Sequence, residues 1–155
     1  MRYIKTYESF ESEIKDIESE LNKKSEKVLE ILESVRDDIN DILLEIEDEG
    51  FCARVSISNW NKTEPFITRG GLQGGWVSEK RYSMIIHIYK DVLKPGQSPF
   101  ANTNYFSAEY VEEYILRLED YVKDNLPSDY KLKRDLEYNG GRVSIITIKI
   151  NNYTD

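Results

Sequence analysis

The sequence is short of the residues that usually build catalytic and metal sites. Its 155 residues include one histidine, His87, and one cysteine, Cys52. A structural zinc site needs four Cys or His ligands, and a Ser–His–Asp or Cys–His arrangement would have to use these two residues. A single cysteine also cannot form a disulfide within the chain, so nothing points to an oxidising compartment. We therefore expect no catalytic residue, no metal and no cofactor, and we predict that the chain is not an enzyme.

Long apolar segments are also missing. No apolar run approaches the ~20 residues that span a bilayer, and the opening residues, Met1 to Glu8, lack the apolar core of a signal peptide. We expect a cytoplasmic protein. Only 39% of the residues are hydrophobic, yet 12% are aromatic, including 11 tyrosines. Because disordered chains are poor in aromatic residues, we expect this chain to fold, and its length suits one domain.

The charge is distributed unevenly along the chain. Residues 1–50 contain 7 Lys/Arg and 16 Asp/Glu, a net charge of −9, whereas residues 51–155 contain 14 and 13, a net charge of +1. Nucleic-acid binding needs cations that replace condensed counterions, so the first segment disfavours it. Its carboxylates form a solvated face, a docking surface for a basic partner, or both.

Residues 6–48 are predicted to form a long helix. The stretch has no Pro or Gly, and its apolar rows drift as expected for a straight α-helix. The first row consists of Tyr7, Ile14, Leu21, Val28, Val35 and Ile42. The pattern lapses at residues 22–25, where Ser25 could cap a new helix, so one long helix or a kinked helix pair would fit. Gly50 is well placed to end the helix.

After Gly50 the apolar period changes from 3.6 to 2, which predicts β-strands. Residues 51–57 alternate as a half-buried strand. Residues 82–90 are apolar on both faces, which is typical of a central strand and gives His87 a packing role. Residues 130–138 and 142–150 flank an Asn-Gly-Gly turn and predict a hairpin.

A second helix is expected to begin at Ser107 and to end before Pro127. Its predicted core row is Val111, Tyr114, Ile115, Leu118 and Val122. The sequence therefore predicts an α+β fold in the order α-β-β-α-β-β, with a small antiparallel sheet. We expect an acidic helical segment, residues 1–50, and a sheet domain, residues 51–155, that together form one compact unit.

Two predicted connections, residues 59–80 and 92–106, are longer than folding requires, and such loops are usually functional or disordered. The first contains both tryptophans and four glycines. Because Trp, Tyr and Arg dominate interface hot spots, we predict that this loop contacts a protein partner. The predicted partner-binding residues are Trp60, Phe66, Arg69, Leu72, Trp76 and Arg81. The competing interpretation is that both tryptophans cover the end of the core.

Two further patterns favour weaker interpretations. The glycine-rich segment at residues 69–76 lacks the Gly-Lys-Ser/Thr ending of a nucleotide P-loop, so a small-ligand site there is only a third hypothesis. Four basic residues cluster on the C-terminal hairpin: Lys131, Lys133, Arg134 and Arg142. With neighbouring tyrosines they could bind bases, but Asp135 and Glu137 interrupt the cluster. A solvated face fits better, and we expect no direct nucleic-acid binding.

The opening residues 1–10, Met-Arg-Tyr-Ile-Lys-Thr-Tyr-Glu-Ser-Phe, resemble the start of many small proteins of tailed bacteriophages. The resemblance covers these ten residues and implies a virus-encoded protein. The predicted order of elements, a long helix followed by a small sheet with one crossing helix, is also similar to that of phage neck and tail-terminator proteins. The resemblance implies residence in the cytoplasm of a host cell or in the virion.

The first hypothesis is therefore a non-enzymatic protein–protein interaction or virion-assembly protein, working as a homo-oligomer or with a virion or host protein and without a membrane. An acidic helix could dock head to tail on a neighbour's basic hairpin and close a ring. The alternative is an acidic inhibitor of a host nucleic-acid-binding or defence protein. It would use the helix carboxylates Glu18, Glu30, Asp37, Asp38, Asp41 and Glu45.

Overall fold

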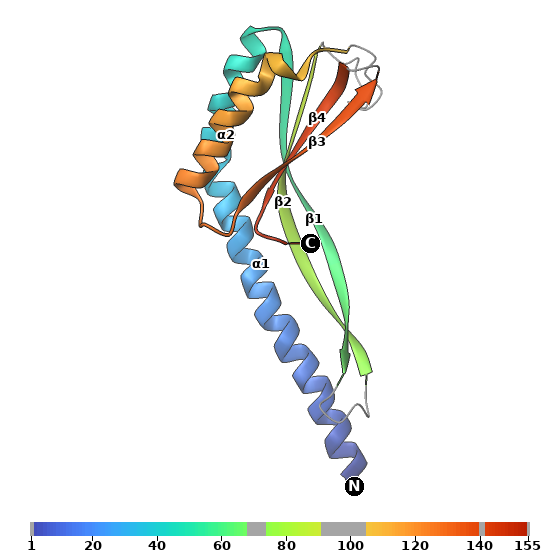
Figure 1. Cartoon of the computed structure of the whole chain (residues 1–155). Helices are drawn as coiled ribbons and strands as arrows, with labels where there is room; N and C mark the ends of the chain where they lie inside the picture. The colour runs from blue at the N-terminus through green and yellow to red at the C-terminus, as the bar shows by residue number, and fades with distance from the viewer. Residues whose placement is uncertain (1, 68–73, 91–104, 140–141, 155) are drawn as a thin grey trace. The chain divides into compact units, whose positions relative to one another are not determined.

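The computed structural model describes residues 2–67, 74–90, 105–139 and 142–154 (Figure 1). The elements are α1 (Arg2–Asp48), β1 (Phe51–Ile67), β2 (Gly74–Lys90), the 3-10 helix η2 (Ala108–Val111), α2 (Glu112–Asn125), β3 (Lys131–Asn139) and β4 (Arg142–Asn151). The four strands form one sheet in the order β1-β2-β4-β3, in which β4 runs antiparallel to both of its neighbours. The predicted α+β fold and element order are confirmed. None of the described helices has the length and apolar character needed to cross a membrane.

The chain divides into two compact units. Unit 1 consists of residues 1–30 and 59–82, and unit 2 consists of residues 31–58 and 83–155. Unit 1 therefore contains the first part of α1 with the hairpin end of β1 and β2. Unit 2 contains the rest of α1, the start of β1, the end of β2, and all of α2, β3 and β4. The predicted boundary at residue 50 falls between α1 and β1 inside unit 2.

Helix α1 is continuous, so of the two predicted alternatives the single long helix is confirmed. Ser25 does not cap a new helix. Its hydroxyl donates a hydrogen bond to the carbonyl oxygen of Leu21 (2.9 Å), four residues earlier in the same helix. Of the polar residues that interrupt the apolar pattern, residues 22–24 are exposed, whereas Ser25 is buried. Helix α1 ends at Asp48, and Gly50 follows with a φ of 89°, a left-handed conformation that glycine adopts at low cost.

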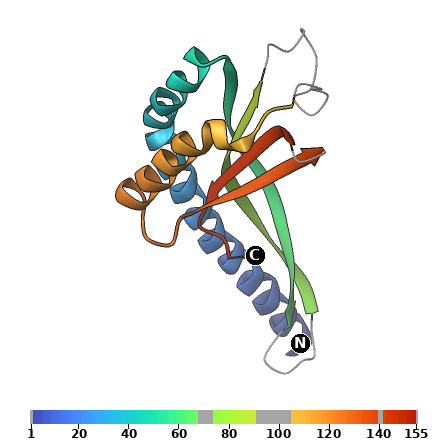
Figure 2. The same cartoon turned by 45° about the horizontal axis from the view of Figure 1, so that its top comes forward.

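The core of unit 2 lies between two helices and one face of the sheet (Figure 2). The register pairs alternate aliphatic residues of β2 and β4, which places them on the same face. These fully buried residues are Met84, Ile86, Ile88, Ile146, Ile148 and Ile150. From the helices, Leu32, Ile39 and Ile46 of α1 and Ile115 and Leu118 of α2 are equally buried. Full burial of each such side chain stabilises the fold by about 1.5–3 kcal/mol.

Helix α2 runs antiparallel to the C-terminal part of α1. Three contacts join the helices: Tyr121 donates to the Asp38 carboxylate (2.6 Å), Arg117 pairs with Glu45, and Tyr114 donates to Glu49 (2.7 Å). Later residues of α2 contact earlier residues of α1, which is the pattern of an antiparallel helix pair. The predicted core row of the second helix, from Val111 to Val122, is buried. Ser107 precedes η2, but its side chain makes no capping hydrogen bond.

The prediction of a loop at residues 59–80 is wrong. Residues 59–67 belong to β1 and residues 74–80 to β2, so both strands continue well beyond the predicted strand ends. The apolar alternation that marks a half-buried strand is missing here because Asn59, Asn61 and Thr63 occupy exposed positions. Most of the second predicted connection, residues 91–104, lies outside the described residues.

Candidate protein-contact surfaces

Unit 1 combines a helix and a hairpin with few buried side chains. Ile14, Ile17 and Leu21 of α1 are only half-buried. Between them, the Glu18 carboxylate accepts a hydrogen bond from the backbone N–H of Ser78 on β2 (3.3 Å). A strand at the edge of a sheet presents backbone groups that need partners. Glu18 supplies one such partner, so a side-chain contact links the helix to the hairpin at Ser78.

The side chains of β2 within unit 1 alternate between covered and exposed positions. Val77 is buried, and Glu79 and Arg81 form a 3.0 Å ion pair in which their side chains are only 18% and 13% exposed. The positions between them are exposed. Trp76 is the extreme case, with 67% of its surface exposed. Because alternate residues of a strand point to opposite faces, the Trp76 indole lies on the solvent side of the hairpin.

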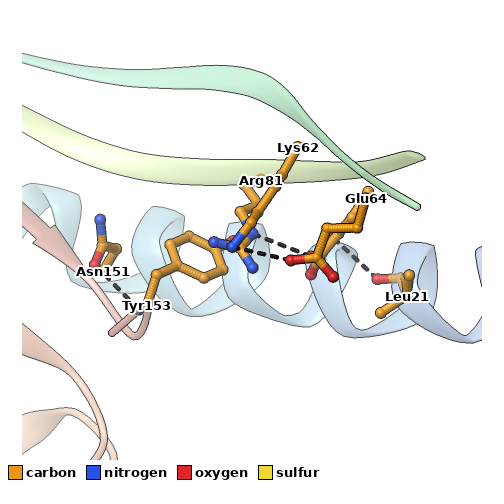
Figure 3. Close-up of polar contacts among 8 residues, drawn as sticks. Leu21, Lys62, Glu64, Arg81, Asn151 and Tyr153 are labelled. Atoms are coloured by element: carbon orange, nitrogen blue, oxygen red, sulfur yellow. Dashed lines mark hydrogen bonds and ion pairs between the residues drawn. The ribbon is translucent and has the colours of Figure 1, made fainter. Parts of the chain in front are cut away.

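The predicted partner-binding residues differ in their exposure. Trp76 and Trp60 are exposed, at 67% and 38%, while Phe66 is half-buried and Arg81 is occupied by Glu79. Arg69 and Leu72 lie outside the described residues. On β1, a 3.1 Å ion pair joins Lys62 to Glu64, two residues further along the same strand (Figure 3). Of the six predicted residues, Trp76 has the strongest structural support.

Two sets of acidic side chains on or next to α1 differ in their contacts. One set is used internally: Glu18 binds the hairpin, whereas Asp38, Glu45 and Glu49, which follows the last residue of α1, bind α2. The other set lies opposite the buried stripe of α1, is exposed, and makes no polar contact with any described residue. It consists of Glu33, Asp37, Asp41 and Asp48, with Leu44 (54% exposed) among them. We call these five residues the outer acidic stripe. Their spacing of three or four residues places them along one helix face.

The sheet face of unit 2 that points away from the helices carries exposed cations. The register pairs Lys133 of β3 with Lys149 of β4, and Ile85 of β2 with the same Lys149. Lys131 precedes Lys133 by two positions and therefore shares its face. Arg54 of β1 lies with its guanidinium 5.9 Å from the centre of the Tyr89 ring. We call Arg54, Lys131, Lys133 and Lys149 the basic sheet face; all four are exposed.

Arg134, one of the four basic residues of the predicted C-terminal hairpin, does not share a sheet face with Lys133. Arg134 pairs with Glu112 (2.7 Å) and Glu119 (3.1 Å) of α2, so it lies on the helix side of the sheet. The physical reason is the two-residue period of a strand, which separates an even-numbered residue from its odd-numbered neighbours. Arg142 is exposed at the start of β4.

Two tyrosines and the histidine of unit 2 have pKa values that differ from their usual values. The hydrogen bond to Glu49, together with burial, raises the pKa of Tyr114 to about 12. Burial and the Asp38 carboxylate raise the pKa of Tyr121 to about 12. Burial and the neighbouring Arg54 charge lower the pKa of His87 below its usual 6.5. The half-buried His87 imidazole is therefore neutral at pH 7 and lies within the sheet, where its strand was expected to place it.

Among the residues with described positions, no three His, Cys, Asp or Glu side chains converge in a way that could hold a metal ion. The comparisons with known proteins add no further guide: no protein-family model, curated protein or solved structure matches the chain.

Proposed function

We propose that the chain is a non-enzymatic protein–protein interaction protein that works in assembly, with the hairpin of unit 1 as its main contact element. The observation that carries this proposal is the exposure of Trp76, at 67% of its surface. Exposed apolar surface costs about 25 cal/mol per Å² relative to burial. Tryptophan is also the residue type most enriched at the energetic centres of interfaces.

The architecture of the hairpin supports a contact role. Both tryptophans of the chain lie on it, Trp60 on β1 and Trp76 on β2. A strand backbone holds an indole with only two side-chain torsions left to fix, so binding through it costs little conformational entropy. The resemblance of residues 1–10 to phage proteins favours virion assembly as the setting, in the host cytoplasm or in the virion.

The acidic-inhibitor alternative has weaker support. It needs six carboxylates of α1 to be available to a basic partner, yet three of them, Glu18, Asp38 and Glu45, are already bound within the chain. The small-ligand hypothesis is also weak. Gly74 and Gly75 lie in strand β2 instead of preceding a helix, as a phosphate-binding loop would require.

The test compares Trp76→Ala with Tyr110→Ala by multi-angle light scattering of the purified chain. Tyr110, on η2 in unit 2, is also 67% exposed and serves as a matched control. We expect the wild type to form a defined oligomer. Trp76→Ala should weaken that oligomer by about tenfold or more, because a hot-spot tryptophan contributes roughly 2 kcal/mol or more. Tyr110→Ala should leave it unchanged.

A second readout uses the fluorescence of Trp76 in a Trp60→Phe variant. The indole should be quenched readily by acrylamide in the dilute chain and be protected in the oligomer. Equal effects of the two alanine variants, or an indole that remains fully quenchable in the oligomer, would contradict the proposal.

A further inference from the structure

Unit 2 carries two surfaces of opposite charge, and neither is covered by a counterpart among the residues that the structure describes. The outer acidic stripe presents four carboxylates, and the one basic residue of α1 in this interval, Arg36, is turned toward β1, where it donates to the Val55 carbonyl oxygen (3.4 Å). The basic sheet face presents four cations. Two acidic residues of β3, Asp135 and Glu137, occupy register positions of the same parity as Lys133. Cations therefore outnumber acidic residues on the basic sheet face, and the outer acidic stripe contains no cation.

Two cations of the basic sheet face repel each other because they occupy paired positions on neighbouring strands. Lys133 and Lys149 stand directly opposite on neighbouring strands, where like charges destabilise a sheet. The Lys133 ammonium donates to the backbone carbonyl oxygen of Tyr153 (3.0 Å), which offsets part of this repulsion. Lys131 and Lys149 make no polar contact with any described residue. An anionic group placed between the strands would relieve the repulsion.

We propose that unit 2 stacks head to tail on a second copy of the chain, so that the basic sheet face of one copy covers the outer acidic stripe of the next. This inference rests on the proposed assembly function and adds a second contact to that of the hairpin. The occupant of the sheet face is helix α1 of the neighbouring copy, lying across β3 and β4.

The spacing of the charges fits this contact. Side chains four residues apart on a helix, such as Asp37 and Asp41, are separated by about 5–6 Å. Neighbouring strands are separated by about 4.8 Å. A helix crossing the strands can therefore place successive carboxylates over Lys149 and Lys133. Leu44 lies in the same stripe and Ile85 lies beside Lys149, which supplies an apolar contact inside a charged rim.

The positions of the two surfaces determine the type of assembly. Helices α1 and α2 cover one face of the sheet, and the outer acidic stripe points away from that face, whereas the basic sheet face is on the other side (Figure 2). The two surfaces cannot meet within one chain, nor can a pair of copies satisfy both contacts at once. The contact is heterologous, so it builds a closed ring or an open filament rather than a symmetric dimer.

A nucleic acid is the competing occupant of a basic sheet. The chain has a net charge of −8, which repels a polyanion as a whole and disfavours phosphate binding. A second copy offers carboxylates at a matching spacing together with an apolar residue. We therefore assign the sheet face to the chain itself, and nucleic-acid binding becomes an outcome of the test.

The test is a charge swap in a Trp76→Ala background, which removes the hairpin contact and isolates the stacking contact. Sedimentation equilibrium measures self-association of three chains: Lys131→Glu with Lys149→Glu, Asp37→Lys with Asp41→Lys, and all four changes together. Lys123→Glu and Asp124→Lys on the exposed end of α2 are single-reversal controls, and the two together match the net charge of the four-change chain.

Each double reversal should weaken self-association by about tenfold or more, because it places like charges face to face. The four-change chain should regain the starting association, and the controls should keep it. Raising the salt from about 0.05 M to about 0.5 M should weaken the contact of the starting chain, since screening is stronger at higher ionic strength.

Two results would overturn the inference. One is a four-change chain that stays as weak as the double reversals. The other is an unchanged mass together with loss of single-stranded oligonucleotide binding in the lysine variant, which would make nucleic acid the occupant. Neither result contradicts the proposed function, because the comparison of Trp76→Ala with Tyr110→Ala is made separately, in chains with wild-type charges.

Discussion

Units 1 and 2 share helix α1 and strands β1 and β2, to which unit 2 adds α2, β3 and β4, and the two units differ in what they bury. Every fully buried large side chain of the described residues belongs to unit 2, from Leu32 to Ile150. Among the side chains of unit 1 that the structure describes, the buried ones are Ser25, Val28 and Val77. The difference shows that α1, β1 and β2 build a core over one part of their length and present a surface over the rest.

This comparison separates stability from contact. Unit 2 has the aliphatic core that cooperative folding needs, whereas unit 1 is held by a thin apolar strip and the contact between Glu18 and Ser78. Segments with few buried apolar contacts open locally at low free energy. Such a segment gains order when it binds, which suits a contact element.

The largest expected effect concerns the core of unit 2. Ile148→Ala removes a fully buried side chain from the sheet face that packs against the helices. We expect a loss of about 2–5 kcal/mol in the free energy of unfolding. The matched change in unit 1, Ile17→Ala, affects a half-buried residue and should cost about 1 kcal/mol or less. Urea denaturation followed by circular dichroism measures both. Equal losses would show that the two units share one core.

A smaller effect is expected at Val77, a buried residue of unit 1. Val77→Ala removes two methyl groups and should cost about 1–2 kcal/mol. Trp76→Ala, next to it but exposed, should change stability by no more than about 0.5 kcal/mol. Thermal unfolding of the two variants compares the faces of the same strand. A large loss for Trp76→Ala would mean that the indole covers the core.

The sequence predicted these elements unevenly, for physical reasons. The core rows of α1 and α2 follow from helical periodicity because buried positions must be apolar there, as at Leu32 and Leu118. The strand at residues 59–67 was not predicted, because an exposed strand lacks the alternating apolar residues from which a half-buried strand is recognised. Strand alternation separates Arg134 from Lys133 in the sequence, but it does not tell which of the two faces the helices cover.

Other features depend on contacts between residues far apart in the sequence. The pairing of Asp38 with Tyr121 and of Glu45 with Arg117 requires α2 to lie antiparallel to α1. No local pattern distinguishes these carboxylates from the free ones at Asp37 and Asp41. Likewise, composition identifies Trp76 as an interface residue type, but its exposure appears only with the alternation of β2.

The smallest expected effect is a decline in the stability of unit 2 at alkaline pH. The pKa values of Tyr114 and Tyr121 are raised to about 12 in the folded chain, against about 10 in the unfolded chain. The contribution of the two tyrosines to the free energy of unfolding is therefore fully present below pH 10. It is lost as the pH rises to 12, because the tyrosines of the unfolded chain release their protons first.

Urea midpoints measured from pH 9 to pH 12 check this expectation. Tyr121→Phe removes one of the two groups, so the decline should become shallower, and the free energy of unfolding at pH 8 should fall by about 1 kcal/mol because the hydrogen bond to Asp38 is lost. A Tyr121→Phe variant with the wild-type slope would show that this hydroxyl is not coupled to Asp38.

The most direct test of the contact role of unit 1 is hydrogen exchange of the free and assembled chain, followed by mass spectrometry. The account predicts that peptides from residues 59–67 and 74–82 exchange rapidly in the dilute chain and become protected on assembly. The core peptide at residues 112–125 should be protected in both states. An assembled chain whose hairpin peptides exchange as fast as in the dilute chain would contradict the account.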